Sequence, residues 1–145
     1  MNAAAVRLAP WALLLLPLAL ALTSPVARAG QNCARKPPSP EQIRSALDLA
    51  AKTARWLDSS GAMLAVIARR GQNLDRYGVR YSHLGYVYRD EGAKAWRIVH
   101  KLNQCGTAES ALYRQGLAEF FSDDLFDFEA GLVVPTLAVQ DALRP

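Results

Sequence analysis

The residues of this sequence best suited to chemistry are two histidines and a cysteine close together in the chain, His83, His100 and Cys105. A thiolate is a strong nucleophile, and an imidazole exchanges protons near neutral pH. A nucleophilic cysteine needs a base within hydrogen-bond reach and a third group that orients this base. We therefore predict Cys105 as the nucleophile, His83 as general base and acid, and His100 as the orienting residue. Such a site would transfer an acyl group from an amide, ester or thioester.

The spacing of the two histidines predicts that their rings meet across a β-hairpin. If the turn is centred on Glu91-Gly92, His83 lies directly opposite His100. Opposed residues of an antiparallel pair share a face, with Cβ atoms ~4.5–5.5 Å apart. A slip of one residue would move one ring to the other face. Gly85 shares the predicted face, and its missing side chain would leave room for a substrate beside His83.

The position of Cys105 predicts an activated thiol. Cys105 lies two residues before Thr107, where we expect a helix to begin and to run to Phe121. The positive end of a helix dipole favours a thiolate over a thiol. Backbone N–H groups at Cys105 and its neighbours could then form an oxyanion hole.

Two other interpretations of these residues stay open. Cys33 and Cys105 could form a disulfide, because an even cysteine count in an exported protein favours pairing. The chain would then be a non-catalytic module, and the two histidines would be structural residues with ordinary hydrogen bonds. A zinc site at His83, His100 and Cys105 lacks a fourth ligand and a recognisable metal spacing, so we expect no metal and no cofactor.

Residues 1–29 have the pattern of a secretory signal peptide. Arg7 precedes an apolar run at 11–22, and Ala27-Arg28-Ala29 predicts cleavage before Gly30. The run is shorter than the roughly 20 apolar residues that span a membrane. We therefore expect a bacterial protein that is periplasmic or secreted and has no stable membrane span after cleavage.

The rest of the chain predicts an extended lead-in at residues 30–39 and a single globular domain at 40–145. Hydrophobic periodicity and turn residues predict the following elements. They are a helix from Pro40 with Ile43, Leu47, Ala50, Ala54 and Leu57 inward, strands at 63–67, 81–89 and 95–102, a helix at 107–121, a strand at 125–134 and a short helix from Pro135. This order indicates an α+β fold with a small, mostly antiparallel sheet and packed helices.

Charge limits the range of partners. Without residues 1–29 the chain keeps fifteen basic and thirteen acidic residues, and no basic run is interleaved with aromatic residues, so we expect no nucleic-acid partner. Five arginines form a local cluster in the sequence, at positions 69, 70, 76, 80 and 89. The cluster could attract an anionic envelope substrate such as a phospholipid head group, although a solvated surface explains it equally well.

Three segments of the chain resemble a known family: "RYSHLGYVYRD", "WRIVHKLNQCG" and "ALYRQGLAEFFSDD". They are similar to a family of uncharacterised secreted bacterial proteins, the domain of unknown function numbered 2145. The resemblance runs from about Gly61 to about Leu143 and implies no established activity.

A weaker likeness lies at the level of the fold. The "SHLG" strand, a second histidine on the next strand and a cysteine at a helix start resemble circularly permuted papain-like enzymes, such as cell-wall peptidases and lecithin–retinol acyltransferases. This resemblance implies a papain-like cysteine hydrolase or acyltransferase with His83 as base, His100 as orienting residue and Cys105 as nucleophile. Its substrate would be an envelope peptide, lipid or acyl group.

Overall fold

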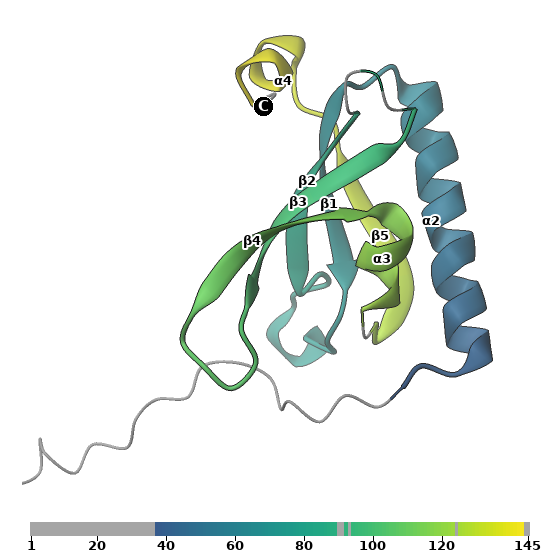
Figure 1. Ribbon diagram of the computed structural model, residues 1–145, viewed down its shortest axis with the longest axis vertical. Coiled ribbons are helices and arrows are strands. Elements are labelled where there is room, and N and C mark those ends of the chain that lie inside the picture. The colour runs from purple at the N-terminus through teal and green to yellow at the C-terminus, as the bar shows by residue number, and fades with distance from the viewer. Residues whose placement is uncertain (1–36, 90–91, 93, 124, 144–145) are drawn as a thin grey trace, which may run out of the picture.

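A computed structural model describes residues 37–89, 92, 94–123 and 125–143 (Figure 1). The fold is α+β, as predicted. Its elements are α2 (Pro40–Ser60), β1 (Leu64–Arg70), the short 3-10 helix η1 (Asp75–Tyr77), β2 (His83–Arg89), β3 (Trp96–Asn103), β4 (Ser110–Gly116), α3 (Leu117–Ser122), β5 (Asp127–Val133) and α4 (Leu137–Leu143). The expected signal peptide at 1–29 and most of the expected lead-in at 30–39 lie outside the described residues.

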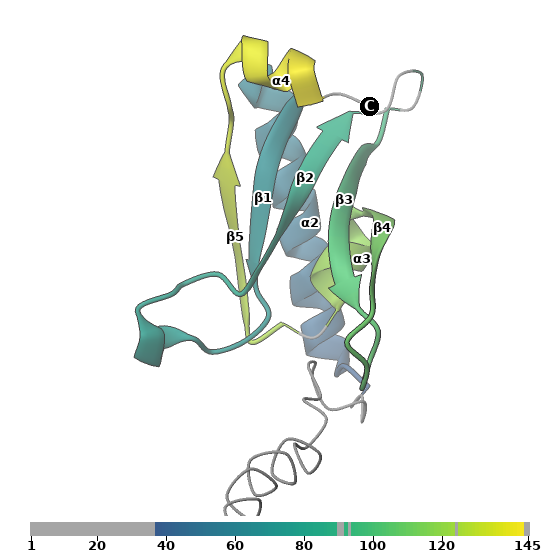
Figure 2. The ribbon, with the colours of Figure 1, turned by 90° about the vertical axis from the view of Figure 1, so that its left-hand side faces the viewer.

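The five strands form one antiparallel sheet in the order β4-β3-β2-β1-β5. Consecutive strands from β1 to β4 are neighbours, and β5 returns to pair with the other edge of β1. The helices α2 and α3 lie behind the sheet in Figure 2, against one face. The core forms between this face and the two helices, and its fully buried large side chains are Leu57, Ile67, Val87, Ile98, Phe120 and Phe121.

The start of α2 is fixed by local chemistry. The Ser39 hydroxyl accepts a hydrogen bond from the Gln42 backbone N–H, and the Gln42 side chain accepts one from the Ser39 N–H. This reciprocal capping box satisfies two N–H groups that the first turn leaves unpaired. The helix ends at Gly61, whose positive φ of 70° suits glycine.

The buried side of α2 differs from the predicted stripe. Its buried residues are Ala46, Ala50, Thr53 and Leu57. The prediction placed Ile43 and Leu47 inward, but these side chains are 43% and 48% exposed. Stripes at 43/47/50/54 and 46/50/53/57 both fit the helical period of 3.6 residues. The surface supplied by α3 and β5, against which α2 packs, selects the second stripe.

The predicted helix at 107–121 is wrong over its first half. Residues 110–116 form strand β4, which pairs along its whole length with β3, and the helix begins only at Leu117. Gly106 takes a positive φ of 72° in the turn that joins the two strands. Pairing with the open edge of β3 therefore overrides the weak helical preference of this segment.

Within the described parts of the chain, no helix is long and apolar enough to cross a membrane.

Candidate functional site

The two histidines meet on the sheet face that α2 and α3 cover, as the sequence predicts. The Nε2 atom of His83 lies 2.7 Å from the Nδ1 atom of His100. His100 is buried and His83 is partly buried. Both rings lie near Phe120 of α3, with ring centroids 6.0 Å and 5.2 Å from its own.

The hairpin register differs by two residues from the predicted one. Tyr86 pairs with Val99 and Arg89 with Trp96, so continuing this register places Gly85, and not His83, opposite His100. Arg89 and the Trp96 indole both donate hydrogen bonds to Asp58 Oδ1 of α2, which fixes the strand ends independently of the turn. A shift of two residues keeps every side chain on its face, so the histidines still meet as diagonal neighbours.

Gly85 therefore has a different role from the one predicted. A Cβ atom at Gly85 would lie 2.8 Å from the Val99 carbonyl oxygen and 2.9 Å from the His100 Cβ. The missing side chain makes room for β3 and His100, not for a substrate.

A chain of hydrogen bonds continues from the histidine pair. His100 Nε2 lies 2.7 Å from Gln115 Oε1, and Gln115 Nε2 donates to Glu119 Oε1 at 3.1 Å. The Glu119 carboxylate can only accept, so the Gln115 amide must turn its N–H₂ toward Glu119 and its oxygen toward His100. We call these four residues the histidine relay: His83, His100, Gln115 and Glu119.

The relay fixes the tautomers of both rings. Because Gln115 presents an oxygen, His100 must carry its proton on Nε2, which leaves Nδ1 as an acceptor. His83 then donates its Nε2 proton to His100 Nδ1. In neutral His83 the remaining acceptor is Nδ1, and this atom is the one that could take up a proton.

Both imidazoles favour the neutral form. Burial, the Arg69 guanidinium and the neighbouring His100 lower the pKa of His83 from 6.5 to about 4. Burial also lowers the pKa of His100, although its hydrogen bond to Gln115 opposes this shift. At neutral pH both histidines of the relay are therefore uncharged, and His83 is a weak base.

Arg69 is a buried charged group beside the histidine pair. It lies directly opposite His83 on β1 and is 5% exposed. Its guanidinium donates to the Phe120 carbonyl oxygen and to Asp123 Oδ2 at 2.8 Å, and stacks 4.8 Å from the Phe120 ring centroid. Arg69 thus ties β1 to α3 and keeps a positive charge beside His83.

Cys105 does not lie at a helix start. It is exposed on the turn between β3 and β4, and α3 begins only at Leu117, so the predicted helix dipole does not act on its sulfur. Cys105 lines a surface cleft of about 590 Å³ with Gln115, Glu119 and Asp123. No cysteine in the described part of the chain is a free thiol. Cys33 lies outside the described residues.

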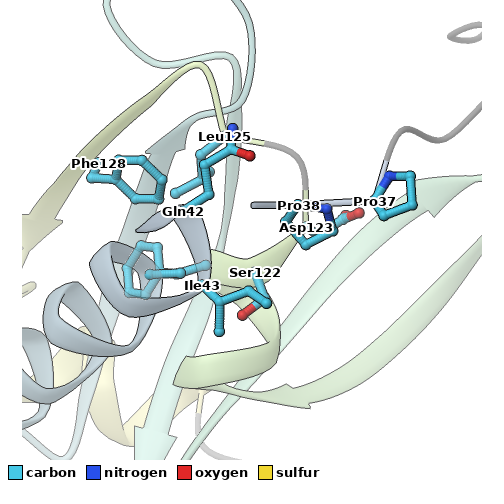
Figure 3. A pocket seen from close by; sticks show the side chains of 10 residues that line it. Pro37, Pro38, Gln42, Ile43, Ser122, Asp123, Leu125 and Phe128 are labelled. Carbon is cyan, nitrogen blue, oxygen red and sulfur yellow. The ribbon is translucent and has the colours of Figure 1, made fainter. Parts of the chain in front are cut away.

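A second pocket, of about 360 Å³, adjoins this cleft (Figure 3). Pro37 and Pro38 lie at one side of it, and Ile43, Leu125 and Phe128 give it an apolar lining. The pocket and the cleft share Ser122 and Asp123. The entry of the chain into α2 therefore lies close to the cleft that Cys105 lines.

The predicted arginine cluster is mostly engaged in ion pairs. Arg69 pairs with Asp123, Arg70 with Asp75 and Asp127, Arg80 with Glu129, and Arg89 with Asp58. Arg80 and the Tyr81 hydroxyl both bond to Glu129 and lower the pKa of this carboxyl from 4.5 to about 2. These four arginines hold strands and loops together through their ion pairs.

No group of three histidine, cysteine or acidic side chains able to hold a metal ion occurs among the described residues. The sequence did not single out Arg69, Gln115 and Glu119 as parts of the site. Arg69 follows Ile67 by two residues, so the alternation of β1 could have placed both side chains on the inner face. A correct prediction of β4 would have placed Gln115 beside His100.

The family model described as an uncharacterized protein conserved in bacteria (DUF2145) matches residues 56–145. The match covers β1 to α4 and every residue of the histidine relay.

The chain belongs to DUF2145. Neither a curated protein nor a solved structure matches it significantly. The likeness to permuted papain-like enzymes thus has no support, and the turn position of Cys105 differs from the helix start that this likeness implies.

Proposed function

We propose that this DUF2145 protein is an exported bacterial envelope protein that acts as a non-catalytic module stapled by a Cys33–Cys105 disulfide. The observation that carries the proposal is the setting of Cys105, on an exposed turn, without a helix N-terminus and not as a free thiol. The weak basicity of His83 agrees with a structural role for the histidine relay, since a general base works best with a pKa near the working pH.

The staple would link Cys33, just before the start of the described chain, to Cys105 on the β3–β4 turn. Cys33 precedes Pro37 by four residues, which reach about 14 Å when extended. Pro37 lines a pocket that shares Ser122 and Asp123 with the cleft lined by Cys105. The pocket at the start of the described chain and the cleft that Cys105 lines therefore meet at Ser122 and Asp123.

The test counts thiols and measures stability on the full chain. We expect no alkylation of the denatured protein without reductant and two alkylated cysteines after reduction, by intact mass. Cys33→Ser, Cys105→Ser and the double variant should each lower the free energy of unfolding by about 2–4 kcal/mol, because the same loop opens in all three. The reduced wild-type protein is the matched control. Two free thiols, or a loss confined to one single variant, would contradict the staple.

A second candidate is a thiol-dependent hydrolase or acyltransferase that acts on an amide, ester or thioester in the envelope. One observation favours it: the tautomers of the histidine relay leave His83 Nδ1 as a proton acceptor, as a general base requires, although His83 and Cys105 line different hollows of the surface. This function requires a free Cys105 that reacts with iodoacetamide near pH 7 and reacts more slowly in His83→Ala. A fully oxidised protein that stays unreactive would eliminate this candidate.

A further inference from the structure

The sheet has one face that α2 and α3 do not cover (Figure 2). Side chains alternate along each strand, so the partners of one row lie on the same face. One such row runs across all five strands through Val133, Val66, Tyr86, Val99 and Arg114. Of the helices in the described residues, α4 alone approaches this side, at one end of β1. We call this surface the open face.

Large apolar side chains lie exposed on the open face. Leu84, Leu112 and Val133 are 61%, 73% and 65% exposed, and Tyr86 is 43% exposed. They come from three different strands, β2, β4 and β5, and the register of the sheet gathers them on one surface. Contiguous apolar surface of this kind marks an interaction site more often than single exposed residues do.

The charge of the open face is one-sided. Strands β2, β3 and β4 contain no acidic residue, and they place Arg97, Lys101 and Arg114 on this face. On the β1–β5 side, the basic groups Arg70 and Arg80 are paired with carboxylates. The open face therefore joins apolar side chains to a positive region over β3 and β4.

We propose that the open face binds the surface of an anionic lipid membrane. Aliphatic side chains can enter the headgroup region, tyrosine favours the membrane–water interface, and basic side chains are attracted to anionic headgroups. Arg97 and Lys101 complement a negatively charged surface, whereas two copies packed on this face would bring these positive charges together. This inference does not rest on the Cys33–Cys105 staple, because all its residues lie on the sheet.

Vesicle co-sedimentation of the full chain tests the proposal. We expect binding to vesicles with about one-third phosphatidylglycerol, and weaker binding as salt rises. Each basic residue removed should weaken partitioning about fivefold, so Arg97→Gln/Lys101→Gln should bind about 25-fold more weakly. The matched control, Arg44→Gln/Lys52→Gln, makes the same change of net charge on the exposed side of α2 and should bind as the wild type does. Leu112→Ser should also weaken binding.

The variants share their N-terminal segment with the control, so a difference between them reports on the open face. Equal binding by the two double variants would overturn the proposal. So would a dimer in analytical ultracentrifugation that Leu84→Asp dissociates, because the open face would then be a contact between two copies. Circular dichroism of each variant shows whether a loss of binding comes from unfolding.

Discussion

His83 is the residue through which pH acts most directly on this protein. Its pKa is about 4 in the folded chain and 6.5 in the unfolded chain. Between these values the unfolded state binds more protons, so the free energy of unfolding falls as pH drops from 6.5 to 4 and is fully retained above 6.5. The folded relay thus requires neutral histidines.

We expect acidification from pH 7 to pH 4 to cost about 1–2 kcal/mol through His83, after allowance for its partial exposure. His83→Gln should flatten the decrease of Tm over this range, since the chain has just one other histidine. Calorimetry at several pH values measures the effect. An unchanged slope in His83→Gln would contradict the lowered pKa of His83.

The sequence predicted the meeting of the two histidines although it gave the wrong register. Alternation along a strand fixes the face of each side chain, and an error of two residues leaves this face unchanged. The same alternation could not predict that Gln115 and Glu119 belong to the relay. They depend on β4, and β4 exists because β3 offers it an edge.

At the scale of elements, the close approach of β2 and β3 depends on Gly85. Gly85→Ser should lower the free energy of unfolding by about 1–3 kcal/mol, because its Cβ would press on backbone and on His100. Gly116→Ser is the matched control, since a Cβ there meets nothing within 4 Å and serine suits its N-cap position. Urea unfolding measures both. Equal losses would show that the packing at Gly85 has no special role.

The elements with clear local signals were predicted well. The helix predicted from Pro40 begins at this residue, and the strands predicted at 81–89 and 95–102 overlap β2 and β3. The segment 107–116 carries no comparable signal. Its structure is decided by a neighbouring strand, which a local pattern does not contain.

At the scale of the whole molecule, Gln140 joins the C-terminal helix to the first strand. Its side-chain oxygen accepts hydrogen bonds from the Met63 and Leu64 N–H groups at 2.9 Å and 3.1 Å, and its amide donates to the Pro135 carbonyl oxygen. Gln140 is 3% exposed, so water cannot replace these bonds. The side chain therefore holds α4 over the start of β1.

Gln140→Met should lower the free energy of unfolding by about 2–3 kcal/mol, because buried backbone donors lose their acceptor. Val139→Ala, at an exposed position of the same helix, should change it by less than about 0.5 kcal/mol. Thermal unfolding of the two variants provides the comparison. A neutral Gln140→Met would mean that α4 is not bound to β1 through this side chain.

The strand order in the sheet also determines the order in which the strands can pair during folding. The strands β1 to β4 follow one another as neighbours and can pair as soon as each is synthesised, whereas β5 must return to β1 from far along the chain. Contacts between distant segments form slowly. Until β5 arrives, β1 keeps an unpaired edge that another nascent chain could occupy. The last part of the chain thus protects the first strand from intermolecular aggregation.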